Sequence, residues 1–301
     1  LTIMEEASEL VERIKKNENL PMFTSCSPGW IKFVEQAYPQ FINNLSTCKS
    51  PQQMLGALVK NYFSKNENIE PENIYSVAIM PCTAKKFEAG RPEMSYKGND
   101  DIDAVLTTRE LVKLIKMKGL DINSLSPILA DNPFGDRSTA GKLFGVTGGV
   151  MEAAVRTAYW LLTGEDLKVP AIKEIRGLDG IKETSIKIGE LEINVAVVNG
   201  LDNARKVLDD IISGKKVYHF VEIMSCPGGC IAGGGQPIGA DLDAIRARMQ
   251  ALYKIDEKES IRTSHNNPSI KRIYDEFLGH PNSEMSHKLL HTHYHKREIL
   301  V

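Results

Sequence analysis

Three apolar runs of this chain end in cysteine, and this pattern constrains the fold more than any other feature. The runs read PMFTSCSPGW from Pro21, VAIMPCTAKKFE from Val77 and FVEIMSCPGGCIAGGGQP from Phe220. Each run resembles a buried strand, and each cysteine falls where a Pro- or Gly-rich turn begins. Open α/β sheets bind ligands at the carboxyl ends of their strands. We therefore expect the four thiols to meet at one place: Cys26, Cys82, Cys226 and Cys230.

Thiols gathered from distant parts of a chain most often share a metal. An all-thiolate set favours an iron–sulfur cluster or zinc. A Gly-rich turn alone also fits a sharp bend or a phosphate loop, but phosphate loops do not need thiols. Five cysteines among 301 residues do not form a secreted disulfide scaffold. Reduced thiols, and so a cytoplasmic location, are favoured.

Helical and strand patterns alternate along the chain, which predicts an α/β fold with mainly parallel sheets. Strand-turn-helix repetition is the basis for this prediction. The predicted strands span 21–25, 74–80, 104–106, 193–198 and 218–224. The predicted helices span 3–16, 29–37, 50–62, 108–117, 149–162, 203–212, 241–252 and 268–278.

Charge and hydropathy exclude several classes of function. The formal net charge is −2, so nothing indicates a nucleic-acid partner. No apolar run reaches the roughly 18 residues that a membrane span needs, and no signal peptide precedes the first helix. No GxGxxG motif indicates a nicotinamide or flavin site.

Ionisable residues form a stripe on the first predicted helix. Glu6, Glu9 and Arg13 have the spacing that puts them on one face. Two interpretations stay open, a proton path from a buried end to the surface or an ordinary Glu9–Arg13 surface pair. Glu5 and Glu12 lie on another face and are expected in solvent. Glu5 also has the spacing of a capping-box partner for an N-cap Thr2.

The three cysteine loops resemble the signature loops of the FeFe-hydrogenases, the iron-only enzymes of hydrogen chemistry. The resemblance extends through LTIMEEASELVERI, NLSTCKSPQQM, DIDAVLTTREL, FGVTGGVMEAAVRTA and LLHTHY, in family order. It implies two α/β lobes with mainly parallel sheets that clasp a buried iron–sulfur cofactor. Residues 1–301 are then the C-terminal portion of an H-cluster catalytic domain without its N-terminal segment. We expect approximate lobes at 1–125 and 126–280, and a C-terminal tail at 281–301.

The resemblance implies a six-iron cofactor, the H-cluster. Cys82, Cys226 and Cys230 are expected to ligate a 4Fe-4S cubane. Cys230 would also bridge to a two-iron subcluster with CO, CN and a bridging dithiolate. In the family the fourth cubane ligand is a second cysteine in the first loop, and this chain has Ser27 there. Two candidates for the fourth ligand therefore stay open, Ser27 and the adjacent Cys26.

The resemblance also implies the surroundings of this cofactor. Lys85 and Gln52, with Pro51, are expected on the cyanide side. An ion pair between Lys85 and Glu88 is the alternative for this lysine. The side chains expected to pack around the iron are Met80, Met224 and Phe144.

A proton relay is the second functional element that the resemblance implies. It would run from Cys26, nearest the iron, outward through four further residues: Glu6, Ser46, Glu9 and Arg13. A thiol suits the inner position because it titrates closer to neutrality than a hydroxyl.

The implied activity is the reversible conversion of protons and electrons to hydrogen. The implied partners are H2 and protons, ferredoxin or other iron–sulfur or flavin electron-transfer modules, and maturation proteins. Two alternatives stay open, a hydrogen-sensing domain, favoured by Ser27, and an iron–sulfur assembly protein related to the family. Cys48 is expected to be a small buried filler and His219 a satisfied core residue. The remaining histidines are expected in a partly ordered C-terminal segment: His287, His291, His293 and His295.

Overall fold

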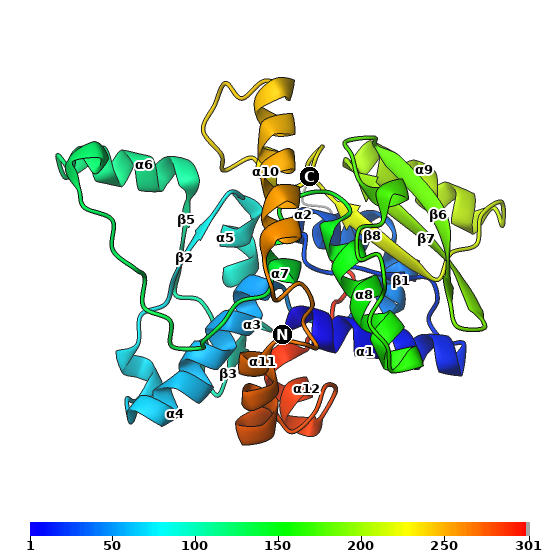
Figure 1. Cartoon of the computed structure of the whole chain (residues 1–301), viewed down its shortest axis with the longest axis horizontal. Coiled ribbons are helices and arrows are strands. Elements are labelled where there is room, and N and C mark those ends of the chain that lie inside the picture. Colours follow the sequence, from blue (N-terminus) through cyan, green and yellow to red (C-terminus); the bar gives the residue numbers. More distant parts are fainter. Residues whose placement is uncertain (299–301) are drawn as a thin grey trace.

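The computed structural model describes residues 1–298 and has an α/β architecture (Figure 1). Its strands are β1 (Met22–Phe23), β2 (Val77–Met80), β3 (Ser95–Tyr96), β4 (Asn99–Asp100), β5 (Ala104–Thr107), β6 (Ile181–Ile188), β7 (Leu191–Asn199) and β8 (Phe220–Met224). Its α-helices are α1 (Thr2–Lys16), α2 (Pro28–Ala37), α3 (Pro51–Leu58), α4 (Ser64–Glu67), α5 (Ala84–Ala89), α6 (Thr108–Met117), α7 (Thr139–Leu143), α8 (Gly149–Thr163), α9 (Leu201–Ile212), α10 (Leu242–Lys258), α11 (Pro268–Ile273) and α12 (Glu284–Leu290).

The larger sheet has four strands in the order β1-β8-β7-β6. The β1–β8 and β7–β8 pairs are parallel, and β6 pairs antiparallel with β7. The mainly parallel α/β prediction is thus confirmed, although the sequence pattern did not identify β6. Strand β1 belongs to the expected first lobe and pairs with β8 of the second, while the boundaries of the two lobes stay a prediction.

Helices cover both faces of this sheet, so most of β7 and all of β8 are buried on both sides. Alternate residues of β8 point to opposite faces: Phe220 and Met224 belong to the core with α1 and α8, and Val221 and Ile223 to the core with α2 and α9. All five residues of β8 are buried. The carboxyl ends of β1 and β8 are held side by side in this three-layer arrangement, which positions two of the cysteine loops.

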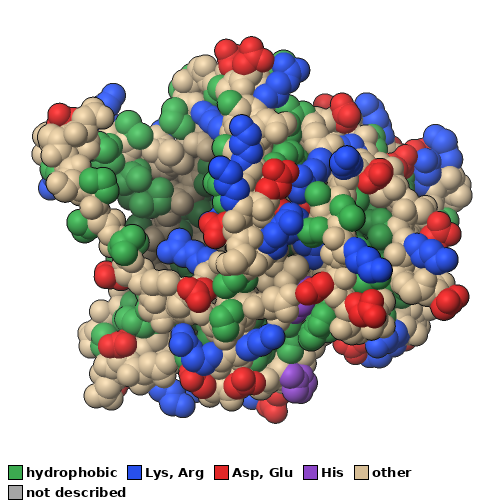
Figure 2. Space-filling model, in the orientation of Figure 1, with side chains coloured by type: hydrophobic (Ala, Val, Ile, Leu, Met, Phe, Trp, Pro, Cys, Tyr) green, Lys and Arg blue, Asp and Glu red, His purple; other side chains and the backbone are tan. Residues whose placement is uncertain are grey.

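The second sheet corrects one prediction. Strand β2 pairs in parallel with β5 alone, and it was expected to be buried. Val77 and Ile79 are instead 49% and 48% exposed, because no described element covers that face of the two-stranded sheet. Figure 2 shows hydrophobic side chains gathered in the hollow between α6 and the rest of the molecule.

The last part of the described chain corrects another prediction. The segment expected as a partly ordered tail forms helix α12, and Leu289 and Leu290 of this helix are fully buried. They pack with α3, since Met54 and Ala57 belong to the same core cluster. Helix α11 and the π-helix Tyr274–Leu278 together match the predicted helix 268–278.

Helix α1 begins at Thr2 with Leu1 as its N-cap and without a side-chain cap. The predicted capping box of Thr2 and Glu5 is therefore wrong. The Glu5 carboxylate binds other partners, which are described below. None of the helices in the described part of the chain has the length and apolarity to cross a membrane.

Candidate metal centre

One cavity of about 330 Å³ lies where the three cysteine loops meet. The loops follow β1, β2 and β8, whose carboxyl ends point toward the same region. This cavity is lined by every residue that was predicted to ligate metal or contact the cofactor, and by Cys26: Cys26, Ser27, Pro51, Gln52, Met80, Cys82, Lys85, Phe144, Met224, Cys226 and Cys230. Sequence positions more than 200 residues apart thus share one site.

Glycines bring the second and third loops together. A Cβ atom on Gly233 would lie 2.1 Å from the Pro81 carbonyl oxygen, and one on Gly235 would lie 2.6 Å from the Cys82 nitrogen. The Gly235 amide donates a hydrogen bond to the Pro81 oxygen at 2.9 Å. Gly233 and Gly235 are therefore required by close contact between the backbones of the two loops.

The five cysteines are free thiols. Burial raises the pKa of the Cys230 thiol to about 11, against an opposing effect of Lys85. Burial likewise raises the pKa of Cys26, and the neighbouring Glu6 adds to this effect. Without a cation in the cavity these thiols thus keep their protons at neutral pH.

Ser27 makes contacts that a metal-ligating residue would have to give up in part. Its Oγ lies 2.8 Å from Oγ of Ser225, and it accepts a hydrogen bond from the Ser225 amide at 3.2 Å. The side chain therefore links the first loop to the third. Cys26, the alternative fourth ligand, also lines the cavity.

Lys85 forms the ion pair that was the alternative interpretation of this residue. Its Nζ lies 2.9 Å from Oε2 of Glu88, and both side chains are buried. It also donates to the Cys26 carbonyl at 3.0 Å. Glu88 neutralises the lysine, so an anionic ligand is not required to explain its burial. Lys85 nevertheless lines the cavity, and the two interpretations are compatible.

Gln52 has an unsatisfied atom at the same site. Its Nε2 donates weakly to Glu88 at 3.5 Å, while its Oε1 is buried without a hydrogen-bond partner. Buried polar atoms are normally paired, and an unpaired one at a cavity wall is typical of a place where a ligand binds.

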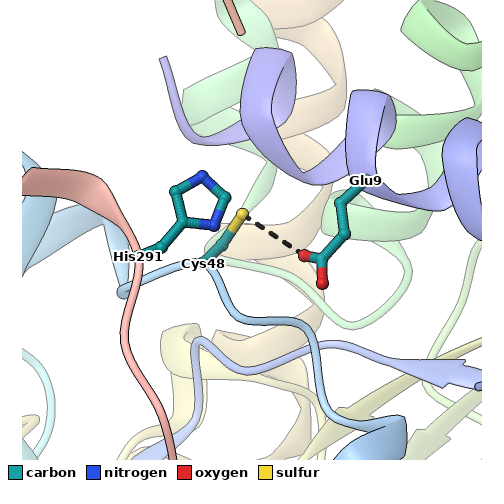
Figure 3. A group of neighbouring side chains, drawn as sticks. All are labelled: Glu9, Cys48 and His291. Atoms are coloured by element: carbon teal, nitrogen blue, oxygen red, sulfur yellow. Dashed lines mark hydrogen bonds between the residues drawn. The ribbon is translucent and has the colours of Figure 1, made fainter. Parts of the chain in front are cut away.

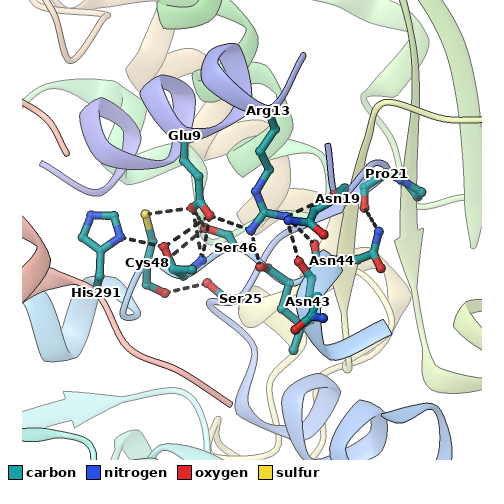
Figure 4. Close-up of polar contacts among 12 residues, drawn as sticks. Glu9, Arg13, Asn19, Pro21, Ser25, Asn43, Asn44, Ser46, Cys48 and His291 are labelled. Carbon is teal, nitrogen blue, oxygen red and sulfur yellow. Dashed lines mark hydrogen bonds and ion pairs between the residues drawn. The ribbon is translucent and has the colours of Figure 1, made fainter. Parts of the chain in front are cut away.

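The outer part of the predicted relay is a continuous hydrogen-bonded chain (Figure 4). Ser46 donates to Oε2 of Glu9 at 2.7 Å, and Arg13 pairs with Oε1 of Glu9 at 2.7 Å. Arg13 is largely buried and also donates to four backbone carbonyls, those of Asn19, Asn43, Asn44 and Leu45. The alternative of a surface Glu9–Arg13 pair is therefore wrong with respect to burial.

The inner part of the relay has a gap. Glu6 is buried, and its Oε2 has no hydrogen-bond partner. Within residues 1–298 no hydrogen bond joins Glu6 to Cys26 or Ser46. Burial, together with the charges of Glu9 and Glu222, raises the pKa of Glu6 to about 8. Glu6 therefore holds a proton at neutral pH.

Sequence reasoning did not identify Glu222, the one charged residue of the buried strand β8. Its carboxylate accepts hydrogen bonds from the Gly148 and Met151 amides at 2.6 and 2.7 Å, at the N-terminus of α8. Burial raises its pKa despite these bonds. A single Glu within the apolar run FVEIM is the sequence signal that could have indicated a buried, internally bonded carboxylate.

Glu5 was expected in solvent, and this prediction is wrong. It is fully buried and accepts hydrogen bonds from the Tyr274 hydroxyl at 2.5 Å and the Asn282 amide at 2.7 Å. Nε2 of His291 lies 3.0 Å from its Oε2. The helix α12 and the segments before and after it bring these partners onto α1. Glu12 is exposed and pairs with Lys16, as expected.

The predictions for two other residues, Cys48 and His219, are correct only in part. Cys48 is 1% exposed and belongs to a hydrophobic core cluster, so it is buried as predicted, but its Sγ also lies 3.7 Å from Oε2 of Glu9. His219 accepts a hydrogen bond from the Asn194 amide at 3.0 Å and is only partly buried.

Comparison with known proteins agrees with the meeting of the three cysteine loops at one cavity. A family model described as the iron-only hydrogenase large subunit, C-terminal domain, matches residues 1–234. The chain belongs to the iron-only hydrogenase family. A second model, described as the iron hydrogenase small subunit, matches residues 242–297. This second segment begins with α10 and includes α12, so the helices that bury Glu5 lie within it.

The hydrogenase relatives are similar along most of the chain. The NADP-reducing hydrogenase subunit HndD of Solidesulfovibrio fructosivorans is 48% identical over 307 residues. Iron hydrogenase 1 of Clostridium pasteurianum is 46% identical over 301 residues. These matches cover 100% and 98% of this chain but 52% of each relative. This chain thus spans about half the length of these two relatives.

Relatives of another class also match. A cytosolic Fe-S cluster assembly factor of Xenopus tropicalis is 31% identical over 307 residues, with 99% of this chain and 64% of the relative covered.

Among solved structures, an FeFe-hydrogenase described in a study of stepwise H-cluster assembly has a TM-score of 0.87 and 44% identity. That match covers 99% of this chain and 82% of the solved one.

Proposed function

We propose that this chain carries the site for reversible hydrogen oxidation and proton reduction at a six-iron H-cluster. The observation that supports this most is the single cavity lined by every predicted ligand and cofactor-contacting residue. Because the chain spans about half of its hydrogenase relatives, the activity is a proposal for the protein to which this chain belongs.

The cavity fits an iron–sulfur cofactor in the chemistry of its lining. Among the described residues, the Cys/His/Asp/Glu group whose ligand atoms all lie within 4.8 Å of one another is Glu9, Cys48 and His291, outside the cavity. The cavity thiols are therefore too widely spaced for one zinc ion and suit a multi-iron body. Gln52 and the buried Lys85 both line this space.

Cys82, Cys226 and Cys230 would hold the cubane, with Ser27 or Cys26 as fourth ligand. Cys230 would also hold the two-iron subcluster with its CO, CN and bridging dithiolate ligands. Lys85 and Nε2 of Gln52, beside Pro51, would donate hydrogen bonds to the cyanides, for which the Gln52 amide would give up its weak bond to Glu88. Met80, Met224 and Phe144 would exclude water. When bound, the cofactor would supply the electrons and the open iron site for hydrogen chemistry.

The chain's own residues would move the proton. The Cys26 thiol faces the cavity, and Glu6 holds a proton at neutral pH because of its raised pKa. Since no direct hydrogen bond joins Glu6 to either neighbour, the proposal requires water between Cys26, Glu6 and Ser46. From Ser46 outward, existing hydrogen bonds lead to Glu9 and Arg13. A surface cavity of about 240 Å³ adjoins Glu9 and Arg13 and supplies the outlet.

The electron partner would be ferredoxin or another iron–sulfur or flavin module. Maturation proteins would install the two-iron subcluster. The abundance of free thiols favours the cytoplasm, although one relative is named as a periplasmic Fe hydrogenase large subunit.

Replacement of Cys230 tests the proposal, because this residue would serve both metal units. The Cys230→Ala variant of the full-length protein should incorporate no two-iron subcluster and should lose hydrogen evolution. Iron content, infrared spectra and circular dichroism of the same sample distinguish cofactor loss from misfolding. Hydrogen evolution that survives in Cys230→Ala overturns the bridging role.

Hydrogen sensing is the second candidate function, and Ser27 is the observation that favours it. A serine at a cubane-ligand position is harder and more basic than a thiolate, which suits a site with altered redox behaviour. The hydrogen-bonded set Ser46, Glu9 and Arg13 favours turnover instead. Hydrogen turnover comparable with that of a standard hydrogenase, in the cofactor-loaded protein, decides against sensing.

A further inference from the structure

A compact group of metal-ligating side chains lies outside the cofactor cavity. Glu9, Cys48 and His291 each offer one ligand atom, and these atoms lie within 4.8 Å of one another (Figure 3). Sγ of Cys48 is 3.7 Å from Oε2 of Glu9. All three residues are buried, and they come from α1, from the segment before α3 and from the residue after α12.

The donor types and their spacing suit a borderline-soft divalent cation. Thiolate, imidazole and carboxylate together are typical ligands of Zn²⁺, at about 2.0–2.3 Å from the metal. Ligand atoms of such a site lie roughly 3–4 Å apart, so small side-chain shifts suffice here. A single thiol with a histidine and a carboxylate does not suit Mg²⁺ or Ca²⁺, which prefer oxygen.

His291 is already oriented as a metal-bound histidine usually is. Its Nε2 lies 3.0 Å from the buried carboxylate of Glu5, while its Nδ1 lies 2.7 Å from Oγ1 of Thr47 on the side of Glu9. A metal-ligating histidine generally donates its other ring N–H to a carboxylate, which fixes its tautomer and orientation. Glu5 meets this requirement, and Tyr274 and Asn282 hold Glu5 in place.

A cation can reach the group from the surface. The surface cavity of about 240 Å³ is lined by Glu9 of the group, by the adjacent Thr47, by the exposed His287, and by Glu12 and Glu18. Arg13 and Lys16 also line it and pair with Glu9 and Glu12, which leaves three carboxylates against two cations. The ring of His287 lies 4.3 Å from that of His291. Carboxylates and an imidazole at the entrance attract a divalent cation and offer it temporary ligands.

We propose that Glu9, Cys48 and His291 form a Zn²⁺ site, whose occupation withdraws Glu9 from the proton relay. Binding forms a metal–sulfur bond and releases the Cys48 proton to solvent. The metal takes Oε2 of Glu9, because Oε1 stays paired with Arg13. That same Oε2 now accepts the Ser46 hydroxyl, so the Ser46–Glu9 link of the relay is lost. The effect on turnover rests on the proposed function, whereas the binding site does not.

Metal binding requires the Thr47 hydroxyl to give up its present hydrogen bonds. The hydroxyl binds both Nδ1 of His291 and, at 3.2 Å, Oε1 of Glu9. On metal binding this hydroxyl or a water completes the fourth tetrahedral position. The loss of these hydrogen bonds keeps the affinity moderate, which suits a reversible inhibitory site.

Cobalt binding to a variant with one remaining thiol tests the site. Serine replaces Cys26, Cys82, Cys226 and Cys230, so that Cys48 is the last of the five cysteines. One Co²⁺ per chain should bind, with a near-ultraviolet thiolate-to-cobalt band and the intense visible bands of tetrahedral Co²⁺. Adding His291→Gln should abolish these bands, and adding His293→Gln, at an exposed histidine two residues away, should preserve them. The site is refuted if the bands are missing in this variant or persist with His291→Gln.

A second measurement covers the case in which the four-serine variant does not fold. Calorimetric titration of the cofactor-loaded protein with Zn²⁺ should give one site that His291→Gln removes and His293→Gln retains. In the same samples Zn²⁺ should lower hydrogen turnover at least tenfold, and His291→Gln should not respond relative to its own zinc-free rate. Zinc binding with unchanged turnover overturns the inhibitory effect and the relay role of Glu9 but leaves the site standing. Without turnover in any sample, the proposed function fails and calorimetry still decides the site.

Discussion

Ser27 and Cys26 are adjacent residues that line the same cavity but have different partners. Ser27 binds the Ser225 side chain and amide, and the hydroxyl is thus already used between two loops. Burial and the neighbouring Glu6 raise the pKa of Cys26, so this thiol keeps its proton unless a metal replaces it. Which of the two completes the cubane decides whether the relay keeps its innermost thiol.

The Ser27→Cys variant should retain more iron and sulfide per chain after reconstitution than the parent protein does. Its reduced cubane should also give a sharper electron paramagnetic resonance signal. A thiolate matches iron–sulfide better than an alkoxide does. Ser225→Ala is the matched control, because it removes the Ser27 contact without adding a thiol. Unchanged iron in Ser27→Cys would contradict the ligand position.

Replacement of Cys26 with Ser27 retained separates the two candidates for the fourth ligand. If Cys26→Ala leaves the cubane intact and slows proton exchange, Cys26 belongs to the relay. If Cys26→Ala strips the cubane, Cys26 is the fourth ligand. The protein would then be nearly inactive as it stands.

The raised pKa of Glu6 predicts that the stability of the protein depends on pH, which can be measured without any cofactor. The pKa of Glu6 is about 8 in the folded protein, against an ordinary value of 4.5. The folded state therefore binds the extra proton between these values, and stability falls as pH rises from about 4.5 to about 8, then levels off. The loss is on the order of 5 kcal/mol, at about 1.4 kcal/mol per pKa unit.

The Glu6→Gln variant should lack this loss. Urea unfolding at pH 5.5 and 8.5 should show Glu6→Gln gaining stability relative to the parent at the higher pH. Glu12→Gln, at an exposed position of the same helix, is the control and should show no such gain. An equal pH dependence in the parent and Glu6→Gln would mean that Glu6 is ionised in the folded protein.

At the scale of elements, the glycine run after Cys230 joins two loops through their backbones. Gly233 and Gly234 are neighbours with different surroundings. A Cβ at Gly233 would lie 2.1 Å from the Pro81 oxygen, whereas one at Gly234 would meet only the Thr83 hydroxyl at 3.7 Å. The relative position of Cys82 and Cys230 thus depends on the absence of one side chain.

Gly233→Ala should therefore destabilise the protein by about 2 kcal/mol, the usual cost of overpacking. Gly234→Ala, an exposed position, should change stability by less than about 0.5 kcal/mol. Denaturant unfolding of both variants without cofactor checks the difference. Equal stabilities would mean that the two loops separate freely.

Sequence patterns predicted some of the strands and their loops but not the burial of every strand. Apolar runs ending in cysteine predicted β1, β2 and β8 and the meeting of their loops. The same patterns could not indicate that Val77 and Ile79 are exposed, because burial depends on which elements cover a strand. Strand β6 has polar residues at its exposed positions, Glu183, Ser185 and Lys187, and was not among the predicted strands.

Contacts between distant segments were the least predictable. Glu5 has the sequence features of a solvated helix residue, but His291, Tyr274 and Asn282 reach it from the far end of the chain. Glu88 was identified as an alternative partner of Lys85 because that contact is local, at i and i+3. Contacts between residues close in sequence can be predicted from their spacing. Contacts between residues about 280 positions apart become visible only in the complete fold.

At the scale of the whole molecule, segments matching two hydrogenase subunit families form one structure. Residues 1–234 supply the cavity, and residues 242–297 supply His287 and His291, which lie beside Glu9 on α1. The outlet of the proposed relay is therefore built by both segments. The ligands for the proposed zinc site come from both as well.

Infrared spectroscopy after reconstitution tests the central proposal most directly. The protein would be loaded with iron and sulfide and then with a synthetic two-iron cofactor. Carbonyl and cyanide bands that shift on protein binding, together with hydrogen evolution, are the result that we predict. A cubane-loaded protein that shows no such bands would contradict an H-cluster site in this cavity.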